Sequence, residues 1–280
     1  MIVAGFLLLA VGAADLVRQF APRRWIGYLT VAIILLLLGS VSDALLPMLA
    51  ALVVGALWVW SMPTERTAPL GFWPAVLLGV AVVSAVVWLG AREDAGLIGS
   101  AWNLRSPFGD LPFDLAVLTI GTGVFLLESA NLVVRAALDG EHTWRPAELA
   151  RRRPEPPLSE TVAPVDHGLT SATGAVAGTA ASDGTESVLD VAAAPRDRRA
   201  GFQGGRLIGP LERVLVMILT LAAAYPILAA MLAAKGIVRF PEISRDGETG
   251  ARAEYFLVGS LVSWVIGLGG AFLVWWAAHV

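Results

Sequence analysis

The ionisable residues of the last quarter of the chain lie near the two ends of an apolar stretch, Gly205–Phe240. Glu212 and Arg213 lie near its start, and the only lysine, Lys235, lies near its end. On one continuous helix the separation of 23 residues between Glu212 and Lys235 spans ~34 Å. The sequence therefore predicts that these two side chains lie at opposite membrane interfaces and do not pair.

Two roles fit these end groups. Their long side chains can anchor the helix ends at the lipid headgroups. Alternatively they form two fixed ion-pair clusters, with Glu212 bonded to an arginine (Arg206, Arg213 or one from another span) and with Lys235 and Arg239 facing the acidic residues of the next loop, Glu242 or Glu254. The sequence leaves both roles open.

A second polar group lies inside an apolar block. Glu128 is followed by Asn131 and Arg135 at +3 and +7, near one face of the block Leu115–Leu138. A charge at such a depth costs roughly 2.5–3.5 kcal/mol on insertion scales, so Glu128 requires a partner, a water-filled cavity or a proton. Three hypotheses follow: a hydrogen bond between helices, a proton- or cation-handling site, and a contact with another subunit.

Three segments of the last quarter resemble, in order and spacing, the C-terminal part of a bacterial multi-pass membrane family of unknown function. They are GRLIGPLER at 205–213, AAKGIVRFPEI at 233–243 and AEYFLVGSLVS at 253–263. Near the start, where that family has His-x-x-x-Asp-Phe-x-x-Gln, this chain keeps Asp15 and Gln19 but has Val11 in place of the histidine. The resemblance implies no reaction, but it implies that these residues matter: Gly205, Arg206, Gly209, Glu212, Arg213, Lys235, Arg239, Phe240, Glu254 and Tyr255.

The elements that carry these groups are long apolar blocks. Hydrophobic residues make up 56% of the 280 and charged residues only 15%, where a soluble domain has about a quarter. Because a helix needs ~20 residues to cross a bilayer, the sequence predicts an all-α polytopic membrane protein of about seven spans. The expected spans are Ile2–Val17, Trp25–Val41, Leu45–Met62, Phe72–Leu89, Leu115–Leu138, Leu207–Ala234 and Tyr255–Ala278.

Residues 139–204 differ from the rest in composition. They are rich in Ala, Gly, Ser, Thr and Pro and carry no regular apolar pattern, so they cannot bury enough surface to offset the entropy of ordering. We expect a disordered cytoplasmic linker between a five-helix membrane domain (1–138) and a two-helix module (205–280). The linker acts as a tether or, through Arg151–Arg153, docks on anionic lipid or an acidic partner.

Orientation follows from the basic residues near the ends of the spans. Arginines are concentrated in the first short loop and in the long linker, which places both on the cytoplasmic side of a bacterial plasma membrane. With seven spans the N-terminus is then outside and the C-terminus inside. The loop 235–254 fits poorly, because it must lie outside although it holds four basic residues: Lys235, Arg239, Arg245 and Arg252.

The last span carries small residues at a helical spacing. Gly259, Ser263 and Gly267 follow one another at intervals of four, which is typical of close helix packing in lipid. We expect this seam to pack against the preceding span in an antiparallel hairpin. The expected partners there are also small: Ala222, Ala223, Ala229, Ala230, Ala233 and Ala234.

Motifs of catalysis and of metal binding do not occur in the sequence. It has no Cys, its three histidines (His142, His167 and His279) lie outside the apolar blocks, and the nearest carboxylate pair, Asp110 and Asp114, is expected to end a loop. We therefore expect neither an enzyme, nor a metal or cofactor, nor a nucleic-acid partner. The sequence favours a membrane protein that acts by assembly, as a scaffold or accessory subunit in contact with lipids and with a protein partner or a second copy. The alternative is a small proton- or cation-coupled transporter or channel centred on Glu128.

Overall fold

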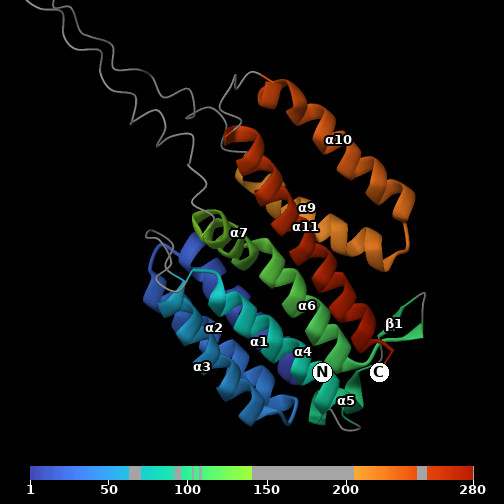
Figure 1. Ribbon diagram of the computed structural model, residues 1–280. Coiled ribbons are helices and arrows are strands. Elements are labelled where there is room, and N and C mark those ends of the chain that lie inside the picture. The colour runs from blue at the N-terminus through green and yellow to red at the C-terminus, as the bar shows by residue number, and fades with distance from the viewer. Residues whose placement is uncertain are drawn as a thin grey trace, which may run out of the picture. The chain divides into compact units, whose positions relative to one another are not determined.

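The structure is a computed structural model that describes residues 1–62, 71–90, 92, 96–102, 104–106, 109–140, 205–244 and 251–279. The described part is mostly helical, as predicted, with one short pair of strands (Figure 1). In chain order the elements are α1 (Ile2–Phe20), α2 (Arg24–Val41), α3 (Leu45–Ser61), α4 (Trp73–Leu89), α5 (Gly96–Ala101), β1 (Arg105–Ser106), β2 (Gly109–Asp110), α6 (Phe113–Leu127), α7 (Ser129–Gly140), α9 (Gly205–Leu221), α10 (Tyr225–Ser244) and α11 (Ala251–Ala277).

The lengths of the helices identify an integral membrane protein. Three of them, α1, α2 and residues Phe256–Ala277 of α11, are long and apolar enough to cross a bilayer, and the bent pair of α6 and α7 makes a fourth. The remaining apolar helices, α3, α4 and residues Tyr225–Val238 of α10, are shorter. The predicted count of seven spans is therefore not confirmed.

Helix α1 forms the centre of the described bundle, with α3, α4 and α6 packed around it. A Cβ atom on Gly5 would lie 2.9 Å from the backbone nitrogen of Leu118, and one on Gly12 would lie 2.8 Å from that of Phe125. The two backbones touch because these positions are glycine, and the contacts advance in the same direction along both chains. Helices α1 and α6 are therefore parallel.

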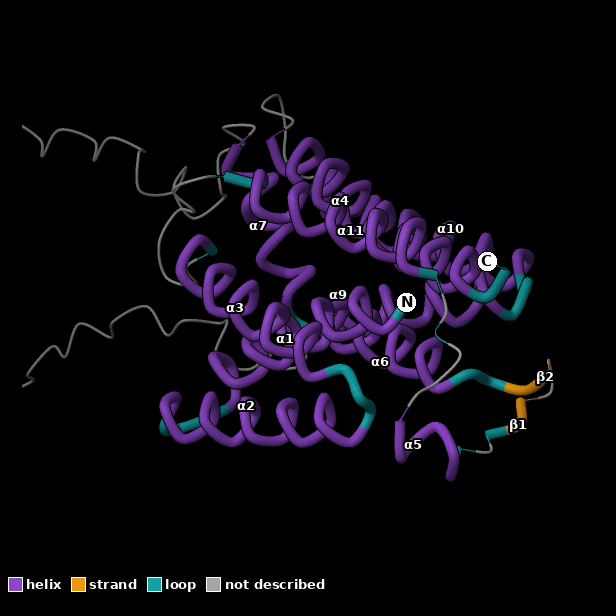
Figure 2. Tube along the Cα trace, turned by 90° about the horizontal axis from the view of Figure 1, so that it is seen from below, coloured by secondary structure: helices purple, strands orange, loops and turns teal. Residues whose placement is uncertain are grey.

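Helix α2 lies at the edge, beside α1 and α3 (Figure 2). Its large apolar side chains are mostly exposed, Leu29, Ile33 and Leu37 each by half or more. In lipid such a face needs no protein cover, because acyl chains are as apolar as leucine.

Two tight turns of the same construction join α2 to α3 and α9 to α10. At their centres Asp43 and Ala223 have φ of 50° and 53°, and the next amide donates five residues back, Ala44 N to Gly39 O at 2.8 Å and Ala224 N to Leu219 O at 2.9 Å. This is the hydrogen-bonded, left-handed cap that ends many helices. A proline follows in the first turn of each next helix, where a missing amide donor does little harm.

The turn at Ala223 overturns one prediction. The expected span Leu207–Ala234 is two antiparallel helices, α9 and α10, because the left-handed cap reverses the chain in the middle of the apolar run. The helices on both sides of the predicted linker, residues 1–146 and 204–280, form one compact unit. The prediction of disorder for the linker falls, from residue 141 onward, outside the described residues.

Candidate functional site: buried polar groups between the helices

The most deeply buried cation of the described chain is Arg213 of α9, whose exposed fraction is 2%. Its Nε donates to the carbonyl of Leu126 at 3.1 Å, its Nη1 to Ser263 Oγ at 3.3 Å, and its Nη2 to Asn131 Oδ1. These acceptors lie on α6, α11 and α7. A single guanidinium therefore joins four helices.

The carbonyl of Leu126 is free to accept because the helix breaks just after it. Helix α6 ends at Leu127, α7 begins at Ser129, and the two axes differ by 49°. The last carbonyls of a helix lack partners within it and carry partial negative charge, which favours a cation. The expected continuous span Leu115–Leu138 is therefore wrong in this respect, and Glu128 occupies the break.

Glu128 and Asn131 form a local hydrogen bond, and of the two Asn131 also bonds to another helix, α9. The Asn131 amide donates to Glu128 Oε2 at 3.2 Å, and its carbonyl oxygen accepts from Arg213. Gly209 of α9 faces the same amide, since a Cβ there would lie 3.7 Å from Asn131 Oδ1. Arg135, one turn further along α7, is half-buried and has its own interaction partner.

Glu212 makes a different cluster from the one expected. Its carboxylate accepts from Lys235 Nζ at 2.6 and 2.7 Å and from Trp264 Nε1 at 2.8 Å. The prediction that Glu212 and Lys235 lie at opposite interfaces is wrong, because the turn at Ala223 brings α10 back along α9. Glu212 thus bonds to a lysine and a tryptophan, whereas the sequence predicted an arginine. The Lys235 ammonium also lies 5.5 Å from the Trp264 ring centroid, within cation–π range.

A similar cluster of a carboxylate, a cation and a tryptophan lies on α1 and α3, and it was not predicted from the sequence. Asp15 is only 1% exposed, and it accepts from Arg18 Nη1 at 2.9 Å and from Trp58 Nε1 at 2.8 Å. Arg18 also donates a hydrogen bond of 2.8 Å, from Nη2, to the carbonyl of Met62, which directly follows α3. The spacing of Asp15 and Arg18, three residues apart in an apolar helix, is a signal that could have found this pair.

A third carboxylate, Asp114, is also buried and paired. It receives two hydrogen bonds from Arg92, at 3.0 and 3.2 Å, and the same guanidinium donates to the carbonyls of Ser42 and Asp43 at the end of α2. Asp114 lies in the first turn of α6, directly after the loop that we expect the pair Asp110 and Asp114 to end.

The small-residue seam of α11 exists, but its partners differ from those expected. A Cβ on Gly267 would lie 3.3 Å from Val216 of α9, and Ser263 bonds to Arg213, whereas Gly259 faces Leu138 of α7. Contacts that advance together along α9 and α11 make these two helices parallel, and the predicted antiparallel hairpin is wrong. The alanines expected to meet the seam lie in the turn or on exposed positions of α10.

The remaining predicted residues belong to helices, but their side chains fall outside the described residues. They are Arg206 of α9, Arg239 and Phe240 of α10, and Glu254 and Tyr255 of α11. Gly205 is the first residue of α9. No structural role is assigned to these six positions.

Comparison of the chain with protein-family models, with curated proteins and with solved structures found no match. The resemblance of the C-terminal quarter to a bacterial membrane family therefore stays a prediction.

Proposed function

We propose that the protein works by assembly in the membrane, as a scaffold or accessory subunit of a membrane complex. The observation that supports this most is the fixed position of Arg213. Its three donor nitrogens contact acceptors on three other helices, so breaking any of these contacts leaves a buried charge short of a partner. Such a rigid bundle suits a platform that holds the long segment 141–204 against partners.

The same proposal includes an orientation in a bacterial plasma membrane. The turn at Ala223 returns the chain, so the start of α9, the end of α10 and the start of α11 lie at one end of the helices, and α1 begins and α11 finishes at the other (Figure 1). All arginine-rich connections then fall on one side, which the charge rule makes cytoplasmic. In this orientation the four basic residues of loop 235–254 lie on the cytoplasmic side, in agreement with the charge rule, and the C-terminus lies outside.

Fusions at the C-terminus test this orientation. An alkaline phosphatase fused after Val280 should be active, because that enzyme needs the oxidising outer compartment, and a fluorescent protein at the same place should be dark. A fusion within residues 160–190 should give the opposite pair of results. Fluorescence at the C-terminus would restore the seven-span orientation.

Assembly itself is tested in native membranes. Chemical crosslinking followed by native electrophoresis should give a species larger than the monomer, containing a second copy or another membrane protein. Removal of residues 147–203 separates the two ways of assembling: loss of the larger species assigns the contact to the linker, and its survival assigns it to the helices. A strictly monomeric species in the full-length protein would overturn the proposal.

A second candidate is proton or cation transport at Glu128, and the break in the membrane-spanning pair α6 and α7 favours it. Broken helices in transporters place unpaired backbone groups and acidic side chains near the middle of the bilayer. Purified protein in liposomes should then conduct protons or cations, and Glu128→Gln should abolish the flux. Flux equal to that of empty liposomes excludes this candidate.

A further inference from the structure

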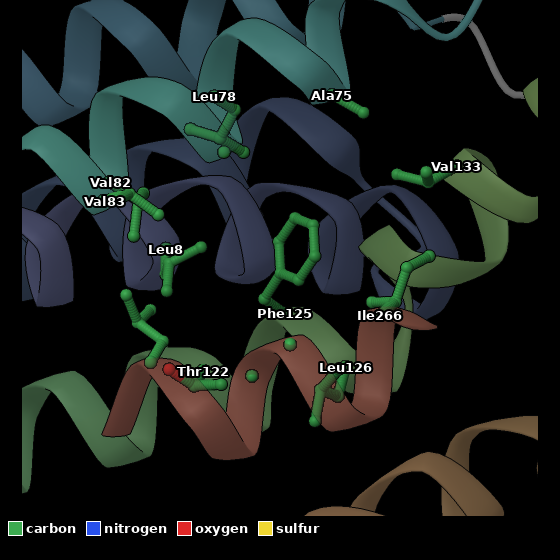
Figure 3. A pocket seen from close by; sticks show the side chains of 14 residues that line it. Leu8, Ala75, Leu78, Val82, Val83, Thr122, Phe125, Leu126, Val133 and Ile266 are labelled. Carbon is green, nitrogen blue, oxygen red and sulfur yellow. The ribbon is translucent and has the colours of Figure 1, made fainter. Parts of the chain in front are cut away.

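An apolar cavity of about 280 Å³ lies beside the break between α6 and α7. Figure 3 shows the ring of Phe125 in the middle of its lining, with Leu78 and Val82 of α4 on one side and Ile266 of α11 on the other. The one hydroxyl in the lining, that of Thr122, donates to the carbonyl of Leu118 at 2.8 Å. No charged residue contributes to the lining.

Two of the glycines in the lining of the cavity leave open the space that a side chain would fill. Gly79 of α4 and Gly269 of α11 both belong to the lining, and a Cβ on either would meet no described atom within 4 Å. The remaining lining residues come from α1, from α4, from the middle of the bent span made by α6 and α7, and from the membrane-spanning part of α11. The cavity therefore lies at the depth of the hydrocarbon core.

Water does not suit this space. A water molecule takes ~30 Å³ in the liquid, and a buried one needs two to four polar partners. The lining offers none beyond a hydroxyl that is already bonded. An empty cavity of this size loses the dispersion contacts of all its lining atoms. At this depth a bilayer supplies one abundant apolar group of suitable shape, the acyl chain.

We propose that the cavity holds one acyl chain of a membrane phospholipid, inserted between α4 and α11. Such a chain stabilises the break, because two residues of the lining connect directly to the buried polar groups. Phe125 packs edge-on against Trp58, with ring centroids 6.1 Å apart, and Trp58 donates to Asp15. The backbone carbonyl of Leu126 accepts the hydrogen bond from Arg213 Nε. Binding of lipid and the fixed geometry of the polar groups are thus coupled.

The test uses the full chain in phosphatidylcholine vesicles that contain a small fraction of phosphatidylcholine with a diazirine in the middle of one acyl chain. After irradiation, peptides carrying Phe125, Leu126 or Ile266 should be labelled. The exposed face of α2, around Leu29 and Ile33, serves as the positive control, because the surrounding bulk lipid should label it. Absence of label at the three cavity residues, together with label on α2, would overturn the proposal.

Filling the cavity gives the decisive comparison. The double variant Gly79→Leu/Gly269→Leu should lose the label at Phe125, Leu126 and Ile266 and keep it on α2. Gly123→Leu is the matched control, because Gly123 also has no described atom within 4 Å of its Cβ position but does not line the cavity. That control should keep the full pattern, and unchanged labelling in the double variant would contradict the proposal.

A second arm identifies the source of the chain. A free fatty acid carrying the same diazirine should label the cavity less than the phospholipid does at equal membrane concentration. The reverse result would assign the cavity to a free fatty acid and overturn the phospholipid proposal. If the double variant does not fold, as judged by thermal melting, each single variant and the mapping on the unaltered chain still decide the question.

Discussion

Two clusters of the same kind join helices in two regions of the molecule, α1 to α3 in one and α9 to α10 and α11 in the other. In each, a carboxylate accepts a tryptophan indole N–H at 2.8 Å and pairs with a cation: Asp15 with Trp58 and Arg18, and Glu212 with Trp264 and Lys235. They differ in burial. The side chains of Asp15 and Arg18 are 1% and 10% exposed, those of Glu212 and Lys235 11% and 24%.

The clusters also differ in how the cation reaches the carboxylate. Arg18 follows Asp15 by one turn of the same helix, so the pair exists as soon as α1 forms. Lys235 meets Glu212 only because the turn at Ala223 places α10 beside α9. The ion pair of the first cluster is thus local and nearly dry, and that of the second depends on tertiary structure and is partly open. Four sets of substitutions test this difference, from the largest expected effect to the smallest.

Asp15→Ala should cause the largest loss of stability. It leaves the Trp58 indole without its acceptor and the Arg18 guanidinium without its counter-charge in a buried site, which costs about 3–5 kcal/mol of unfolding free energy. Denaturant titration of the detergent-solubilised protein measures the loss. Asp15→Asn keeps an acceptor for Trp58 and should lose clearly less; equal losses would mean that the hydrogen bond to Trp58 contributes nothing.

Gly267→Leu should open the contact that supports the second cluster. The leucine has no room between α11 and α9, because even a Cβ lies 3.3 Å from Val216 and 3.5 Å from the Arg213 carbonyl. Overpacking of this kind costs up to about 3 kcal/mol. The thermal midpoint should fall relative to that of Gly123→Leu, and equal midpoints would place the packing face elsewhere on α11.

Glu212→Ala should cost about 2 kcal/mol, between the values for buried and for exposed ion pairs, because the site is partly open. Lys235→Met should cost less, since it leaves the Trp264 hydrogen bond in place. A double-mutant cycle of the two changes should give a coupling energy well above zero. Additive losses would show that the pair seen in the structure contributes no net stability.

Ala223→Gly should have the smallest effect and should be stabilising. An alanine with φ of 53° carries strain of about 1–2 kcal/mol, and the greater freedom of an unfolded glycine offsets part of the gain. We expect a net gain of about 0.5 kcal/mol by thermal melting. Asp43→Gly should gain less, because aspartate tolerates this conformation better than alanine; a loss at Ala223 would mean that its methyl group makes a stabilising contact.

The sequence was sufficient for the parts of the molecule that depend on local pattern. The apolar blocks predicted the positions of α1 to α4 and α11, and the +3 spacing placed Asn131 near the same face as Glu128. The turn at Ala223 was missed because no glycine marks it and the run remains apolar through it. From that one error came the wrong partner for Glu212, the wrong direction for α11 relative to α9 and the wrong role for the alanines.

The hydrogen-bond partners of Arg213 were not predicted, for a different reason. Its acceptors are a backbone carbonyl, an amide and a hydroxyl on three other helices, and no spacing along one segment indicates such a set. The break at Glu128 that frees the carbonyl has no proline or glycine to mark it either. The sequence predicted a carboxylate beside this arginine, whereas in the structure neutral oxygens accept its hydrogen bonds.

The hairpin of α9 and α10 bears on how the chain enters the membrane during synthesis. Its closed end, from Thr220 to Ile227, carries no charged residue, and its ion pair lies nearer the open end. Each charge would separately resist transfer into lipid, by roughly 2.5–3.5 kcal/mol at the centre of a span. Once Glu212 and Lys235 pair, the two helices can enter together as a unit in which these charges cancel, before α11 has been made.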